Sequence, residues 1–190
     1  MTTAKKRAAA VAVLLAAALV AGACGGAGAG KGTSGGRGET VQATTAATEG
    51  TGGAVATAPS IETLDGERFD LSDERGKVVA LYFMAGWCGS CIPEARSWSE
   101  LYPSYKDEGL EVLVVSADPN DSPQTIERFR RAGGIGDLPW AIDRTGRFTR
   151  ALGVRALDTT IILDRRGRVA YRDAVPTPEK KLREELEEVL

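Results

Sequence analysis

The sequence predicts an α/β sandwich built on a mixed central β-sheet, and three observations carry this prediction. Continuous apolar runs, typical of strands buried on both faces, occur at residues 78–84, 111–116 and 159–163. Segments with helical periodicity or helix-start signals alternate with these runs. A further extended segment, 168–173, follows the third run through the short turn 165–167, which predicts a hairpin within the sheet.

Two short extended pieces precede the first long strand, at residues 61–64 and 67–71. Between them lies Asp65-Gly66, a residue pair typical of tight turns because both residues accept turn conformations easily. The two pieces are therefore expected to lie on either side of a tight turn, before the main sheet begins.

Three helices are predicted from start signals and periodicity. Cys91 opens the first helix, and Pro103 within it predicts a kink or a break there. Ser122-Pro123 is an N-cap and first-residue pair for a second helix that ends near Gly133. Thr177-Pro178 opens the third helix. The apolar faces consist of Ala95, Trp98, Tyr102 and Tyr105 in the first helix and of Leu182, Leu186 and Val189 in the third.

The composition restricts the chemistry more than the fold. The 190 residues include 24 Lys and Arg and 26 Asp and Glu, and this net charge of −2 gives no reason to expect nucleic-acid binding. The chain contains no histidine. This absence excludes Ser-His-Asp and Cys-His catalysis, histidine-containing zinc sites and haem ligation by histidine.

Residues 1–24 have the pattern of a secretion signal. A basic region at residues 5–7 is followed by residues 8–23, which contain neither charge nor proline. This apolar stretch is shorter than the roughly 20 residues that span a bilayer. It ends in small residues before Cys24 and so resembles a lipoprotein lipobox, in which the cysteine becomes a lipidated N-terminus. An ordinary secretory signal, with Cys24 removed or free, is the alternative.

Residues 25–57 are predicted to form a flexible tether. Most are glycine, alanine, serine or threonine, and none is leucine, isoleucine, phenylalanine, tryptophan, tyrosine or methionine. Such a segment buries too little apolar surface to offset the entropy lost on folding. Residues 58–190 are therefore predicted to be the one folded domain. With a lipid on Cys24, the tether would hold this domain above a membrane.

The strongest chemical motif is Trp87-Cys88-Gly89-Ser90-Cys91, which follows a buried strand and begins a helix. Cysteines at i and i+3 lie on one face of a helical turn, close enough to form a reversible disulfide. The free N–H groups and the dipole at a helix N-terminus stabilise a thiolate. Cys88 lies nearer to this terminus, so it is predicted to be the more exposed, attacking thiol, and Cys91 the resolving one.

Three alternatives to a redox pair stay open on the residues alone. A structural disulfide is seldom placed at a strand-to-helix junction with a two-residue loop. A zinc site needs about four ligands, and the domain offers no further cysteine and no histidine. A copper carrier would use both thiolates without support from methionine or histidine.

Further short sequence motifs occur throughout residues 58–190. They are Ala58-Pro59, Leu71-Ser72 before Gly76-Lys77-Val78-Val79, Gly153-Val154-Arg155 before Thr159-Thr160, and the turn Asp164-x-x-Gly167. Together with Trp87-Cys88-x-x-Cys91 they resemble the thioredoxin superfamily, specifically its TlpA-like and ResA-like extracytoplasmic branch. The resemblance implies a thioredoxin-like three-layer sandwich. It also implies a thiol–disulfide oxidoreductase whose redox-active disulfide is its only cofactor, with no metal.

The family's catalytic residues match unevenly. Trp87, Cys88 and Cys91 match the family pattern. Glu94, three residues after Cys91, stands where the ResA-like branch has a glutamate that tunes the cysteines and moves protons, and it is carried over as a third catalytic residue. The alternative is a solvated glutamate in the first helical turn. The buried acid that thioredoxins keep six residues before the first cysteine is absent, because Tyr82 stands there.

The largest departure from the family concerns the loop that faces the disulfide. The family has a cis-proline before the strand that begins at Thr159, and here Asp158 takes its place after Leu157. A non-proline cis bond costs about 3 kcal/mol, so this peptide is predicted to be trans. Trp87, Leu157, Asp158 and Thr159 are the predicted substrate-binding residues. A carboxylate near Cys88 is expected to disfavour its thiolate and to slow or narrow exchange.

The predicted function is thiol–disulfide exchange by a monomer anchored to the outside of a cell membrane through Cys24. The expected partners are dithiols or disulfides of other proteins, such as apocytochrome c, and a membrane thiol electron donor or acceptor. Two other functions stay open. A thiol peroxidase shares the fold but needs a threonine three residues before its reactive cysteine, where Ala85 stands. A tethered binding module, with exchange weakened by Asp158, would not be an enzyme.

Overall fold

The structure, a computed structural model, describes residues 58–190. The predicted signal peptide, the predicted lipidation site Cys24 and the predicted tether lie outside the described residues. Among the residues that are described, no helix has both the length and the apolar character needed to cross a membrane.

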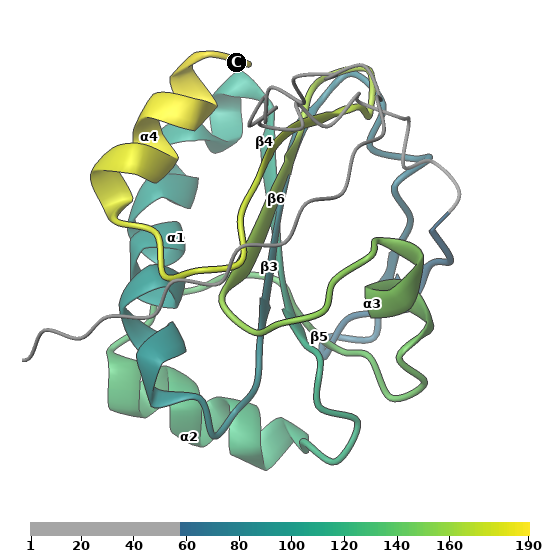
Figure 1. The fold of residues 1–190 in the computed structure, drawn as a ribbon, viewed down its shortest axis with the longest axis vertical. Coiled ribbons are helices and arrows are strands. Elements are labelled where there is room, and N and C mark those ends of the chain that lie inside the picture. The colour runs from purple at the N-terminus through teal and green to yellow at the C-terminus, as the bar shows by residue number, and fades with distance from the viewer. Residues whose placement is uncertain (1–57) are drawn as a thin grey trace, which may run out of the picture. The chain divides into compact units, whose positions relative to one another are not determined.

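A five-stranded mixed sheet forms the centre of the domain (Figure 1). Its order is β5-β4-β3-β6-β7, with β3 (Val78–Met84) between β4 (Leu110–Ser116) and β6 (Thr159–Leu163). β4 pairs in parallel with β3 and with β5 (Trp140–Ile142). β6 pairs antiparallel with β3 and with β7 (Val169–Arg172). The predicted mixed sheet and its hairpin are therefore confirmed.

Helices cover both faces of the sheet and complete a three-layer, thioredoxin-like sandwich. α1 (Ile92–Tyr105), α2 (Pro123–Gly133) and α4 (Glu179–Glu187) lie on one face, and α3 (Arg147–Ala151) lies on the other (Figure 1). Because both faces are covered, every residue of β3 is buried. Val78, Ala80, Tyr82 and Met84 pack under the three helices, and Val79, Leu81 and Phe83 pack toward α3.

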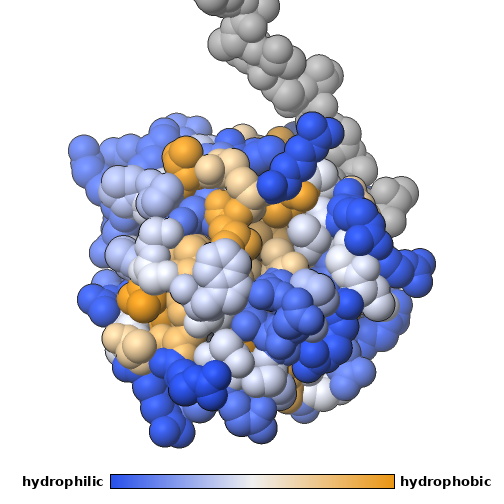
Figure 2. All heavy atoms as spheres, turned by 60° about the horizontal axis from the view of Figure 1, so that its bottom comes forward, coloured by the Kyte–Doolittle hydropathy of each residue, from blue (hydrophilic) through white to orange (hydrophobic). Residues whose placement is uncertain are grey.

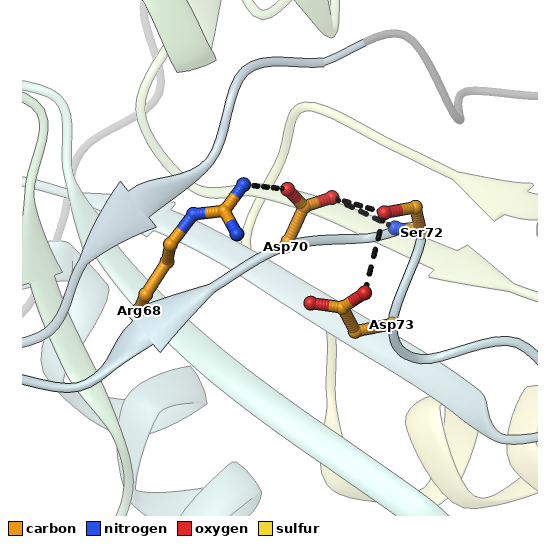
Figure 3. Close-up of polar contacts among 4 residues, drawn as sticks. All are labelled: Arg68, Asp70, Ser72 and Asp73. Carbon is orange, nitrogen blue, oxygen red and sulfur yellow. Dashed lines mark hydrogen bonds and ion pairs between the residues drawn. The ribbon is translucent and has the colours of Figure 1, made fainter.

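A small antiparallel hairpin of β1 (Ile61–Glu62) and β2 (Arg68–Phe69) packs on the α3 side. Side-chain contacts then hold the turn that leads toward β3 (Figure 3). Asp70 accepts hydrogen bonds from the hydroxyl and the N–H of Ser72 at 2.7 and 3.0 Å, and it also pairs with Arg68. The Ser72 hydroxyl is the main reason that the pKa of Asp70 lies below its usual value. Both predicted extended pieces are confirmed, although their strands are shorter.

The predicted helix ends are mostly confirmed. Ser122 caps α2 by accepting the N–H of Thr125 at 3.1 Å, and α2 ends at Gly133. Of the kink or break predicted at Pro103, the break is wrong, because α1 continues to Tyr105. Pro103 lies in the last turn of α1, where its missing N–H costs one helical hydrogen bond and leaves the rest of the helix intact.

Within residues 58–190, one strand and one α-helix were not predicted from the sequence. β5 has three residues and α3 has five, and both lie between α2 and β6 in the chain. Elements of this length are too short to display a hydrophobic period. A 3-10 turn, η2 (Lys106–Glu108), joins α1 to β4.

Candidate active site

The cysteine pair lies where β3 leads into α1. Cys88 and Cys91 form a disulfide. Cys88 precedes a 3-10 turn, η1 (Gly89–Cys91), and Cys91 is then the N-cap of α1. Cys88 is 6% exposed and Cys91 is fully buried, so Cys88 is the sulfur that an incoming group reaches first.

Two aspartates that follow β4 hold the loop before the pair. The Gly86 N–H donates to Oδ2 of Asp121 at 2.6 Å. The Trp87 indole N–H donates to Oδ2 of Asp118 at 2.7 Å. A Cβ at position 86 would lie 2.6 Å from Cγ2 of Thr125, so the loop requires glycine there. Neither aspartate was predicted from the sequence, although parallel strands end at the same edge of a sheet and β3 is followed by the cysteine pair.

The surface around this end of the sheet is partly apolar. Figure 2 turns the lower end of Figure 1 toward the viewer and shows hydrophobic residues gathered near the centre of the face, bordered by hydrophilic ones. Trp87 is 68% exposed, the highest value among the large hydrophobic residues that the structure describes. Leu157 is half-buried against the core. Thr159 is buried, and its hydroxyl donates to the Ala156 carbonyl oxygen at 2.8 Å.

Asp158 lies beside the disulfide, although 70 residues separate it from Cys88 in the chain. Its Oδ2 is 4.0 Å from Sγ of Cys88. A disulfide sulfur carries no hydrogen, so this is a close approach rather than a hydrogen bond. Asp158 has a φ of 54°, the only positive φ of a non-glycine residue within 58–190, and every peptide bond in that range is trans. Aspartate tolerates this left-handed conformation better than most residues do.

Two hydroxyl groups hold the Asp158 carboxylate. The Tyr82 hydroxyl donates to Oδ1 at 2.7 Å, and the Ser90 hydroxyl donates to Oδ2 at 3.0 Å. The Tyr82 oxygen also lies 3.1 Å from the carbonyl oxygen of Cys91. Burial and the hydrogen bond with Asp158 raise the pKa of Tyr82, so it stays a neutral donor. Tyr82 occupies the position of the buried acid that thioredoxins keep. Its hydroxyl connects β3 to a different acid, Asp158, in the loop before β6.

Glu94 is buried, which excludes the alternative of a solvated glutamate. It is 1% exposed and accepts hydrogen bonds from the Thr160 hydroxyl at 2.6 Å and the Thr177 N–H at 2.7 Å. Burial raises the pKa of Glu94 to about 7, and the two hydrogen bonds oppose this rise. Within the described residues its hydrogen-bond partners come from β6 and from the segment before α4, not from the cysteines.

Possible metal ligands come together only in part. Sγ of Cys88, Sγ of Cys91 and a carboxylate oxygen of Asp158 lie within 4.8 Å of one another. In the disulfide neither sulfur is a thiolate, and the thiolate is the form that binds metals. After reduction the three groups would offer one ligand fewer than a structural zinc site takes. The arrangement therefore suits electron exchange better than metal binding.

Comparisons with known proteins agree with this chemistry. The Redoxin family model matches residues 42–190. The thiol-disulfide oxidoreductase ResA of Bacillus thuringiensis subsp. konkukian is 31% identical over 129 residues, which cover 68% of this chain and 73% of that protein. ResA of Geobacillus kaustophilus is 37% identical over 115 residues, covering 60% and 64%. A Chlorobium tepidum structure assigned as a thiol:disulfide interchange protein DsbE has a TM-score of 0.61 and 26% identity, covering 70% of this chain and 94% of its own.

Proposed function

Since this chain belongs to the redoxin family and is a thiol–disulfide oxidoreductase, we propose that it works outside the cytoplasm as a membrane-tethered reductase of disulfides in other proteins. The observation that carries the exchange chemistry is the Cys88–Cys91 disulfide at the junction of β3 and α1. The pair itself stores the two electrons, and exchange between thiols and disulfides needs no further group.

The exchange takes place in two steps. The Cys88 thiolate attacks one sulfur of a client disulfide, and a mixed disulfide forms while the first client thiolate leaves. The Cys91 thiolate then attacks Sγ of Cys88, which restores the internal disulfide and releases the second client thiolate. The assignment of the first step to Cys88 is supported by its exposure, because Cys91 is fully buried.

The position of Asp158 supports the reducing direction. In the disulfide, Sγ of Cys88 lies 4.0 Å from Oδ2 of Asp158. A thiolate on Cys88 would lie about as close to this carboxylate. Like charges at this separation disfavour the thiolate and so disfavour the reduced pair. A pair whose reduced form is poorly stabilised is a strong electron donor, whereas oxidants of this fold stabilise the reduced form.

We expect the reduction potential of the pair to be at or below roughly −250 mV. The measurement is thiol trapping of the full chain equilibrated against redox buffers of known potential. A value near roughly −120 mV would assign the protein to disulfide formation and overturn the reducing direction. Absence of a Cys88–Cys91 disulfide under oxidising buffers would overturn the exchange function altogether.

We propose that the clients are exported proteins whose cysteines must be reduced before use, with apocytochrome c as one candidate. A reductase in this position needs electrons from a thiol donor in the membrane. The support for both partners is the similarity to the ResA proteins and the secretion-type N-terminal pattern. Trapping of clients, described in the Discussion, identifies them directly.

We propose that Cys24 carries the lipid that anchors the protein to the membrane. Full-length wild-type protein is then expected to fractionate with membranes, and a Cys24→Ser variant is expected to move to the soluble extracytoplasmic fraction. Two or more acyl chains bind a bilayer far more firmly than one chain does, so the shift is expected to be nearly complete. Equal membrane retention of both proteins in an immunoblot of the fractions would contradict the anchor.

A further inference from the structure

We propose that Asp158 is the group that accepts and returns the proton of the cysteine pair, a role that rests on the exchange function proposed above. Resolution of the mixed disulfide requires the Cys91 thiol to lose a proton, and Cys91 is fully buried away from bulk water. A base inside the protein is therefore needed near the two sulfurs.

The two oxygens of Asp158 have different tasks in this arrangement. Oδ1 accepts the Tyr82 hydroxyl at 2.7 Å, which fixes the carboxylate. Oδ2 faces the pair, 4.0 Å from Sγ of Cys88, and a carboxylate oxygen lies within 4.8 Å of both sulfurs. One carboxylate is therefore near both sulfurs, including the buried sulfur of Cys91.

Ser90 offers a second route between sulfur and carboxylate. Its Oγ is 3.0 Å from Oδ2 of Asp158 and 3.3 Å from Sγ of Cys88. A hydroxyl can accept a proton from a thiol while donating its own to a carboxylate. This route serves the Cys88 thiol of the reduced pair, whereas the resolving step uses the direct approach of Asp158 to Cys91.

Within residues 58–190, Asp158 has acidic and neutral neighbours and no cationic partner. The titratable groups that face it are Tyr82 from β3, Glu94 from α1 and the cysteines themselves, and Asp173 after β7 lies near Tyr82 and Glu94. Among the described residues no lysine or arginine forms an ion pair with Asp158, Glu94 or Asp173.

Asp158 carries the proton from Cys91 to the departing client sulfur in the proposed step. In the mixed disulfide, Asp158 removes the proton from the Cys91 thiol, and the Cys91 sulfur attacks Sγ of Cys88. The bond between Cys88 and the client sulfur breaks, and the client leaves as a thiolate. The protonated Asp158 then transfers its proton to that leaving thiolate. The client is reduced, the cysteine pair is oxidised, and the carboxylate is regenerated.

Glu94 is less suited to this step than Asp158. Both carboxylates have each oxygen hydrogen-bonded, but Oδ2 of Asp158 also lies 4.0 Å from Sγ of Cys88. The two partners of Glu94 are the Thr160 hydroxyl and the Thr177 N–H. These partners belong to β6 and to the segment before α4. Asp158 instead occupies the loop that faces the disulfide, in a left-handed conformation that is rare for a non-glycine residue and typical of functional positions.

The test follows the two steps of one turnover separately. The reduced full chain is mixed with an aromatic disulfide whose thiolate absorbs light, so attack by Cys88 releases a first chromophore and resolution by Cys91 releases a second. In Asp158→Asn the second release is expected to slow by at least about tenfold near neutral pH, since general bases contribute roughly 10²–10⁴-fold. The difference is expected to disappear at high pH, where hydroxide removes the proton. The first release is expected to be unchanged or faster, because the opposing charge near Cys88 is gone.

Two further variants separate a proton-transfer role from a structural one. Asp158→Ala is expected to regain second-step rate when formate or acetate is added, because a small carboxylate replaces the missing base. Asp143→Asn is the matched control, since Asp143 is also buried but accepts the Thr149 N–H at 2.8 Å in α3. It is expected to leave both releases unchanged.

The outcomes separate this proposal from the function it rests on. A second release in Asp158→Asn that is as fast as in the wild type, or faster, at neutral pH would overturn the proton role and leave exchange intact. Lack of rescue of Asp158→Ala by small carboxylates would also count against it. Failure of the wild-type protein to release the second thiolate at all would overturn the exchange function itself.

Discussion

Replacing Cys88 with serine is expected to lower protein-disulfide reductase activity by at least about 10³-fold, because the thiolate is the nucleophile and a serine hydroxyl does not replace it. Replacing Cys91 with alanine is expected to block turnover at the second step instead. The mixed disulfide between Cys88 and its client then accumulates, because no internal thiol releases it. The measurement is non-reducing electrophoresis and mass spectrometry of adducts captured from an intact envelope.

The two variants serve as controls for each other. Both lose turnover, but only Cys91→Ala is expected to carry clients. Accumulation of adducts on Cys88→Ser and not on Cys91→Ala would reverse the assigned roles. Capture of no client by Cys91→Ala, together with unaltered folding, would contradict an exchange function on proteins.

The stability of the oxidised protein is expected to fall as the pH rises from about 4.5 to about 7, because of Glu94. Burial raises the pKa of Glu94 from 4.5 to about 7 in the folded protein, so the folded protein binds this proton more tightly than the unfolded chain does. Raising the pH through this window therefore disfavours the folded state. Each pH unit corresponds to about 1.4 kcal/mol, an upper limit for a single group.

Denaturant unfolding of the oxidised protein at several pH values measures this dependence. Glu94→Gln is expected to flatten the free energy of unfolding over the window, since an uncharged amide can still accept the Thr177 N–H and pair with the Thr160 hydroxyl. Glu100→Gln, on the exposed side of the same helix, is expected to keep the wild-type dependence because Glu94 is still present. An unchanged pH dependence in Glu94→Gln would show that another group is responsible.

The sequence predicted the main strands and the three longer helices because their signals are local. β3 shows seven consecutive apolar residues, and Ser122 stands where a helix cap is expected. β5 and α3 were missed because three and five residues show no period. The break predicted at Pro103 did not occur, because the cost of a proline depends on its position within the helix.

The redox pair could be found from the sequence alone. Two cysteines three residues apart, after a buried strand and before a helix, predict a redox pair at a helix N-terminus. A structural disulfide, a zinc site and a copper carrier stayed open as alternatives on the residues alone. The absence of histidine excluded most competing chemistries in the same way. These conclusions depend only on residue type and short spacing, so no tertiary contact was needed to reach them.

The environment of the pair was settled only by the tertiary structure. Asp158 meets Tyr82 across 76 residues, and Glu94 meets Thr160 and Thr177 across 66 and 83 residues. These contacts exist because β6 lies next to β3 and brings its preceding loop against the start of α1. Burial and long-range hydrogen bonds set the proton affinity of an acid, and no local propensity encodes them. The sequence by itself determined which atoms exchange electrons, and the fold determined which groups surround them.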